Sequence, residues 1–357
     1  MNDSTKTNIE IESLFNKGLS LNEMADIVMR LNTTSNRHTQ SPLSFSFFVN
    51  MPNERTVELS NGRKHYHIAI PQTLQSVTHA PILHNHDYFE LMFVRNGTLK
   101  LQIENTVYTY HEGDACLFDR NIHHAEIEQA NTSILYCCIT KNFLDNWPEC
   151  GMSYYPKENK LFQRFFHSQD QNPCPSSSFL EFHHIGSKEF VPEVFSCFLA
   201  IRKELERQSP GYWLIIYGLF CRLLYMLIDP KHYKCNYITL KLESLVDTVR
   251  NFIECSSCRL TREDISTALH YNSDYLNRLF KENMGMTLSA YCSYTYIKKA
   301  ASLLLQTDDT VEKIAEAVGF KNPSQFYRQF QKHFHMTPQE YRNMCMNLLE
   351  PKDIDKE

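Results

Sequence analysis

The chain has 357 residues, of which 42% are hydrophobic and 22% are charged, and its formal net charge is −5. This length allows two or more domains with their own cores, and the composition excludes a disordered or collagen-like chain. The longest apolar run, Tyr212 to Ile228, contains Arg222 and is too short to span a bilayer. Because the first residues contain no apolar signal core, we expect a cytoplasmic protein without a membrane partner.

Residues 1–40 begin the chain with a helical pattern. Ile11, Leu14 and Phe15 are followed by Leu21 and Met24 at helical spacing. We interpret this segment as an N-terminal helical arm. It could dock on a neighbouring domain or remain a loosely attached helix, and the sequence does not choose between these.

Between residues 42 and 140 the hydrophobic period changes to two. Short alternating segments such as Leu99–Ile103 are separated by turn signals at Asn61-Gly62 and Asn96-Gly97. A further strand is expected near Ser178–Ile185. Many short strands favour a small β-barrel, which we assign to residues 41–190.

Four polar residues of this region are expected to point the same way and to lie close together. His84 and His86 alternate, Glu90 follows at even spacing, and His124 is expected on a partnering strand. Residues 84–97 and 113–124 resemble the two cupin motifs, although Asp119 and Asn121 depart from the second. That resemblance implies that the three imidazoles and the carboxylate hold zinc, iron, manganese or nickel.

A metal-free site is the alternative to a metal centre. The same side chains could bind the hydroxyl groups of a small organic effector, or could form an inert structural cluster. Tyr88 and Phe93 are the expected apolar walls of an effector site made by His84, His86, Glu90 and His124, although such aromatic residues are more often core residues in a barrel.

Two helices follow the barrel. They are expected at Val191–Gln208 and Gly211–Ile228, separated by Ser209-Pro210-Gly211. Their apolar faces are too broad for an isolated hairpin, so we assign residues 191–230 to a hairpin that packs on the barrel and dimerises. Residues 231–241 have few apolar positions and are assigned to a linker.

A helical pattern then occurs twice. Ile265–Phe280 and Ile314–Phe330 each contain an amphipathic helix, a tight turn, a capping Asn and a second amphipathic helix. The repeat predicts two helix-turn-helix units. They are joined by one continuous helix at Leu288–Gln306, whose length of roughly 28 Å approaches the ~34 Å repeat of the major groove.

The second helix of each unit has a polar outer face. In the second copy, Phe326 and Phe330 are expected inside, and Ser324, Gln325, Arg328, Gln329 and Lys332 outside. Arg can donate two hydrogen bonds to guanine, whereas Asn or Gln can donate one hydrogen bond to adenine and accept one from it. Such a face is suited to double-stranded DNA, whereas two solvated faces of an ordinary helical bundle would be the alternative.

Ile297–Gln306, Val311–Phe320, Asn322–Phe330 and Thr337–Arg342 resemble the DNA-binding domain of the AraC/XylS family of bacterial transcription regulators. The resemblance covers residues 242–346. It implies base contacts by Asn277, Arg278, Ser324, Gln325 and Arg328. The other expected DNA contacts are Asn272, Ser273, Lys281, Lys321, Asn322 and Lys332.

The sequence departs from the family pattern at two positions. His335 stands where the family usually has Gly, so the turn after the second recognition helix is expected to be either strained or differently shaped. Asp274 places a carboxylate, which repels phosphate, on the first recognition helix. Basic and acidic residues are nearly balanced in residues 242–346, so phosphate attraction must come from a local basic stripe.

The sequence thus predicts an α+β multidomain protein. It has a cupin-like barrel with a helical hairpin, an all-α domain with two helix-turn-helix motifs at 242–346, and a charged tail at 347–357. We expect a homodimeric, non-enzymatic regulator of a promoter, an activator that contacts RNA polymerase and senses a sugar or related metabolite. No cofactor is required, although a divalent metal would fit. The alternatives are a metal-dependent cupin isomerase or dioxygenase fused to a DNA-binding module, and a barrel that only dimerises.

Overall fold

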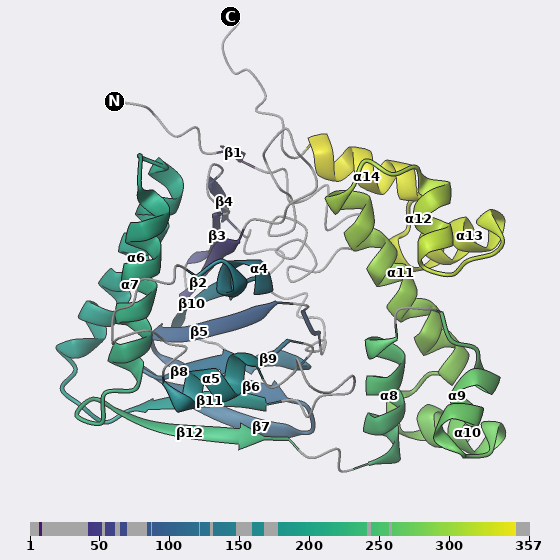
Figure 1. Ribbon diagram of the computed structural model, residues 1–357, viewed down its shortest axis with the longest axis horizontal. Coiled ribbons are helices and arrows are strands. Elements are labelled where there is room, and N and C mark those ends of the chain that lie inside the picture. The colour runs from purple at the N-terminus through teal and green to yellow at the C-terminus, as the bar shows by residue number, and fades with distance from the viewer. Residues whose placement is uncertain are drawn as a thin grey trace, which may run out of the picture.

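The structure is a computed structural model. It describes residues 7–8, 42–51, 54–60, 65–69, 84–86, 88–120, 122–128, 131–147, 159–167, 178–240, 244–256 and 259–347. A strand-rich part with a pair of long helices lies beside an all-helical part formed by the C-terminal residues (Figure 1). This arrangement confirms the predicted fold class.

The strands form two sheets. The larger contains β1 (Thr7–Asn8), β4 (His65–Ala69), β3 (Glu54–Ser60), β2 (Leu43–Met51), β10 (Thr132–Ile139), β5 (Phe89–Asn96), β8 (Ala115–Phe118), β11 (Ser178–His184) and β12 (Tyr233–Thr239), in this spatial order. The smaller contains β7 (Thr106–His111), β6 (Thr98–Ile103) and β9 (His124–Glu128). Every neighbouring pair is antiparallel except the short β1–β4 pair.

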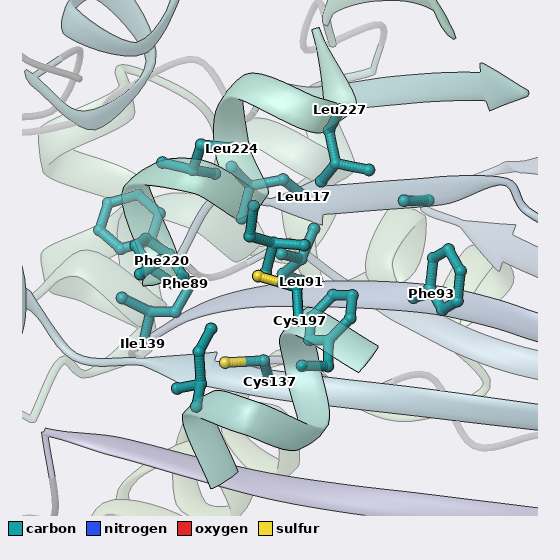
Figure 2. Close-up of a cluster of buried hydrophobic side chains, with 14 of the residues drawn as sticks. Phe89, Leu91, Phe93, Leu117, Cys137, Ile139, Cys197, Phe220, Leu224 and Leu227 are labelled. Atoms are coloured by element: carbon teal, nitrogen blue, oxygen red, sulfur yellow. The ribbon is translucent and has the colours of Figure 1, made fainter. Parts of the chain in front are cut away.

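Side chains of β5 alternate between two hydrophobic cores, because successive residues of a strand point to opposite faces. Phe89, Leu91 and Phe93 pack on the outer face, against the helices (Figure 2). Met92 and Val94 point inward and share a core with the smaller sheet. The two sheets therefore enclose a common interior, and the helices cover the larger sheet from outside.

The helical hairpin consists of α6 (Phe190–Arg207) and α7 (Tyr212–Leu227). Each of the four helix ends differs from the predicted one by a single residue. Gly211 has φ 82° at the start of α7, a backbone conformation that glycine adopts without strain. Two short helices, α4 (Lys141–Asp145) and α5 (Lys160–His167), pack on the same outer core.

The assignment of residues 231–241 to a linker was wrong for most of that segment. Tyr233–Thr239 form β12, which pairs antiparallel with β11 along its whole length. Tyr233 is buried, and its hydroxyl donates a hydrogen bond of 2.9 Å to the Gly113 carbonyl. The strand lies at the edge of the sheet and is half exposed, which weakens the hydrophobic alternation that marks a strand in sequence.

The predicted N-terminal arm lies almost wholly outside the described residues. Within residues 1–40, only Thr7–Asn8 are described, and they form the short strand β1. The charged tail at 347–357 lies outside them as well, apart from residue 347, which ends the last helix.

The described residues of the C-terminal part form seven helices. They are α8 (Leu245–Cys255), α9 (Arg262–Leu269), α10 (Ser273–Met284), α11 (Leu288–Gln306), α12 (Val311–Ala317), α13 (Pro323–Phe334) and α14 (Pro338–Asn347). The central α11 has the predicted bounds and buries Tyr296, Ile297 and Leu304 completely. Since side chains of α10 and α13 share its core, α11 fixes the separation of the two units.

Equivalent positions of the two units adopt the same left-handed backbone. The residue directly after α10 is Gly285, with φ 69°, and the residue directly after α13 is His335, with φ 54°. The predicted strain at His335 is thus found, since a side chain in this region costs roughly 1 kcal/mol or more. A Cβ atom on Gly285 would have no atom within 4 Å, so a side chain there would meet no steric clash with its surroundings. Its cost would come only from the left-handed backbone conformation.

We therefore expect the two substitutions to change stability in opposite directions. His335→Gly should raise the free energy of unfolding by up to about 1 kcal/mol, and Gly285→His should lower it by about the same amount. Urea denaturation of the full-length chain measures both. Changes of the same sign in the two variants would contradict the assigned backbone conformations.

Candidate functional site

The first helix-turn-helix unit is α9 followed by α10. The Asn272 side chain caps α10, because its Oδ1 accepts hydrogen bonds from the backbone amides of Asp274 and Tyr275 at 2.9 and 3.1 Å. Leu276 and Phe280 are the buried side chains of α10. The exposed face that remains carries Arg278 and Lys281.

The second unit, α12 followed by α13, repeats this construction. Asn322 caps α13 by accepting from the amides of Ser324 and Gln325 at 2.9 and 3.4 Å. Pro323 occupies the first turn, where a missing N–H removes no helix bond. Phe326 and Phe330 are buried, so Ser324 and Arg328 face solvent.

Most of the predicted DNA contacts lie on these outer faces. Eight of the eleven are exposed, and Ser273, Asn277 and Gln325 are half-buried. The Asn277 Oδ1 accepts a hydrogen bond of 3.1 Å from the Leu288 amide at the start of α11, so half of its amide group is already used inside the protein.

Gln329, expected on the outer face, instead faces α11. Its Oε1 accepts a hydrogen bond of 3.3 Å from the Ser293 hydroxyl. Helical spacing alone placed it at the border of the polar face, and the position of α11 decides which way it points.

Two contacts in the first unit were not predicted from the sequence. Asp274, flagged as a repulsive carboxylate, lies 3.3 Å from the guanidinium of Arg262, which offsets its charge. Tyr275 is exposed beside Arg278, whose guanidinium lies 5.9 Å from the centre of its ring. Tyr275 was not among the predicted DNA contacts, although its spacing of three residues from Arg278 places both on one helix face.

The barrel brings the four predicted ligands together. Ligand nitrogens of His84, His86 and His124 all lie within 4.8 Å of one another. The Glu90 Oε2 lies 3.0 Å from the His124 Nε2. His84 and His86 lie outside the named strands, but His84 forms an isolated antiparallel bridge with His124, with backbone bonds of 3.0 and 2.9 Å.

The ring of His124 is held in a defined orientation. Its Nδ1 lies 3.2 Å from the Ile122 carbonyl oxygen, so a proton on Nδ1 is donated there and Nε2 faces Glu90. On the other side, the ring stacks on Phe118 with 4.8 Å between the centres. Such a second hydrogen bond is what orients metal-binding imidazoles in proteins.

Glu90 and His124 act as a buried ion pair. Burial alone would raise the pKa of Glu90, but the hydrogen bond from His124 and the charges of His86 and His124 lower it. Burial alone would lower the pKa of His124, but the hydrogen bond and charge of Glu90 raise it. Both directions favour the charged forms.

Three imidazole nitrogens and one carboxylate are also a donor set that fits a divalent transition metal.

Of the two predicted apolar walls, one lies beside the histidines. Tyr88 stacks on His86 with 4.5 Å between the ring centres. Phe93 was wrongly assigned, because it points to the outer face of β5. Its ring centre lies 5.5 Å from that of Phe198 in α6. Since Glu90 and Phe93 are an odd number of residues apart, a straight strand cannot present both to one site.

Two further carboxylates near the barrel interior accept hydrogen bonds from tyrosine hydroxyl groups. Neither pair was predicted. The Tyr110 hydroxyl donates to Glu181 at 3.0 Å, and the Tyr136 hydroxyl donates to Glu126 at 2.7 Å. Glu181 pairs across the sheet with Cys116, an inward residue of β8. Only the strand register reveals this, so the sequence held no direct signal.

No described helix combines the length and the apolar character that crossing a membrane requires.

Comparisons with known proteins match both parts of the chain. A family profile described as "Helix-turn-helix domain" matches residues 265–344, and one described as "Cupin domain" matches residues 72–138. The chain is 36% identical over 117 residues to an uncharacterized HTH-type transcriptional regulator, YtdP, of Bacillus subtilis. It is 33% identical over 84 residues to the lactose operon transcription activator of Staphylococcus xylosus, and 33% identical over 85 residues to the melibiose operon regulatory protein of Escherichia coli.

These alignments cover 32%, 24% and 24% of this chain and 15%, 30% and 28% of the three relatives. The chain therefore matches less than a third of each relative's length. Within those limits the matches confirm the resemblance drawn from the repeated helices and the histidine motif. The chain carries a helix-turn-helix domain together with a cupin domain.

Proposed function

We propose that the chain is a sequence-specific DNA-binding transcription regulator that responds to a small molecule bound by its cupin domain. One observation carries the DNA-binding proposal. Two capped helices, α10 and α13, present Arg278 and Arg328 at equivalent positions, and the single helix α11 joins their units. Its length suits two helices that enter successive major grooves on one face of the duplex.

The chemistry of the exposed side chains supports base recognition. Arg328 and Gln325 can each make two hydrogen bonds to one base edge, whereas Lys321 and Lys332 are suited to phosphate. Because the basic groups form a local stripe on a chain of net charge −5, binding should be salt-sensitive. As an activator, the chain would also contact RNA polymerase.

Arg328→Ala should weaken binding to a duplex selected from a random library by about tenfold or more, since one bidentate base contact is worth roughly 1–3 kcal/mol. Binding to an unselected duplex should change by less than about twofold. Titrations monitored by fluorescence anisotropy measure both. Lys332→Ala is the control, because loss of a phosphate contact weakens both complexes alike. Equal losses on both duplexes for Arg328→Ala would contradict base recognition.

The cupin site is the proposed sensor. The relatives include proteins titled as regulators of lactose and melibiose operons, and we propose a sugar or related metabolite as the effector here. Glu90, the three histidines and Tyr88 supply donors, acceptors and a stacking face for such a ligand. Since the relatives are titled as regulators, we propose sensing rather than catalysis.

The close approach of His84, His86 and His124 supports a second candidate, a divalent metal that anchors the effector. The wild-type chain purified without chelator should then contain about one equivalent of metal, and His86→Ala should contain almost none. Elemental analysis measures this, with His183→Ala as a control at a half-buried histidine outside the cluster. Absence of stoichiometric metal from the wild type would exclude both the anchored metal and a metal-dependent enzyme.

We also propose that α7 forms a homodimer. Leu214 is 68% exposed and Ile215 is 47% exposed on one side of this helix, and Gly218 continues the same surface. Exposed apolar groups at helical spacing are typical of a subunit interface.

Leu214→Glu should convert a dimer to a monomer at micromolar concentration, because it places a charge in an apolar contact. Sedimentation velocity of the full-length chain measures the mass. Val107→Glu, at a residue of β7 that is 54% exposed, is the control and should leave the dimer intact. A wild-type monomer, or a Leu214→Glu dimer, would contradict the proposal.

A further inference from the structure

A buried polar cluster joins the barrel to the helical domain. We call it the interdomain cluster. Its members are Asn85, Glu104 and His123 from the barrel, and Arg250, Glu254 and Tyr291 from the helical domain. In Figure 1, α8, which carries Arg250 and Glu254, precedes the first helix-turn-helix unit and lies nearer the barrel than α9 and α10 do.

The contacts of the cluster are continuous. His123 lies between two carboxylates, with Nδ1 3.2 Å from Glu104 Oε1 and Nε2 3.0 Å from Glu254 Oε1. Arg250 completes the connection through an ion pair with Glu104. The Asn85 Nδ2 also donates to Glu254 Oε2 at 3.3 Å. Because these charged side chains are at most 14% exposed, the loss of one partner leaves a buried charge uncompensated.

Barrel members of the cluster are chain neighbours of the histidine site. Asn85 lies between His84 and His86, and His123 precedes His124. Two backbone hydrogen bonds join His84 to His124, so the two segments move as one. A ligand that draws the three imidazoles together must therefore shift Asn85 and His123 relative to Glu254.

On the helical side, the cluster continues to the first recognition helix. Glu254 accepts a hydrogen bond from the Tyr291 hydroxyl, and the Tyr291 ring lies 5.0 Å from that of Phe280, a buried residue of α10. Lys299 of α11 donates to the carbonyl oxygens of Glu254 and Ser256, at 2.9 and 2.8 Å, at the end of α8. A displacement of Glu254 is thus passed to α8, α10 and α11 together.

We propose that the interdomain cluster couples the histidine site to the DNA-binding surface, with His123 and Asn85 as the positioning residues that transmit ligand occupancy to Glu254. This inference rests on the proposed function, since it assigns the route by which the cupin site regulates DNA binding. Coupling of this kind is reciprocal, and typical couplings change an affinity by about 5-fold or more.

A double-mutant cycle tests the proposal without an identified effector. His86→Ala perturbs the histidine site, Glu254→Gln breaks the cluster, and the cycle is completed by the double variant in the full-length chain. The first measurement is amide hydrogen exchange at residues 245–255, which needs neither DNA nor ligand. We expect His86→Ala to accelerate exchange there by at least about threefold alone, and by much less when Glu254→Gln is already present.

The second measurement is affinity for a duplex selected from a random library. His86→Ala should change it by about 5-fold or more alone and by less than about twofold with Glu254→Gln. Asp309→Asn, an equal charge change at an exposed position of the helical domain, is the control and should leave the His86→Ala effect intact. Asn85→Ala, which removes one uncharged donor to the Glu254 carboxylate and no charge, should reduce the effect with little risk to folding.

Equal effects of His86→Ala in both backgrounds, or no effect in either, would overturn the coupling. Failure to bind any selected duplex would overturn the proposed function, while hydrogen exchange would still test the cluster. Zn²⁺ alone provides a further probe: if it binds the wild type and accelerates or slows exchange in α8, the same amount of Zn²⁺ should have a smaller effect on Asn85→Ala. An undiminished effect would again contradict the proposal.

Discussion

The burial of α11 is the constraint on which the proposed DNA-binding surface depends. Its aromatic and aliphatic side chains share one core with α8, α10 and α13, and Tyr296 and Ile297 are completely buried. Both recognition helices therefore pack against the single rigid helix α11 instead of being linked by a flexible segment. A rod has a fixed length, so the two helices can match only one spacing of contacts along a duplex.

Alternation of side chains along extended segments organises the barrel in a similar way. In β5, odd-numbered residues pack against the helical hairpin, and even-numbered residues, including Glu90, face the interior. Around the bridge between His84 and His124, ligands and cluster residues also alternate along the chain. One short stretch can therefore serve both a binding site and a domain contact, because neighbouring side chains leave the backbone in different directions.

Much of this architecture could be predicted, and the exceptions have physical reasons. The bounds of Leu288–Gln306 followed from apolar periodicity and capping, which are local properties. The strand Tyr233–Thr239 was missed because an edge strand is weakly patterned. Phe93 was misassigned because residue type was considered without strand parity. Glu104 and Arg250 are 146 residues apart, so only the folded chain reveals their ion pair.

The most direct test of a rigid pair of recognition helices is the spacing of their contacts on DNA. Footprinting of the full-length chain on a selected duplex should protect two segments about one helical turn apart for each protomer. Insertion of five or of ten base pairs between those segments should reduce the affinity to that of one segment alone, because α11 cannot lengthen. Affinity that survives either insertion undiminished would contradict the account.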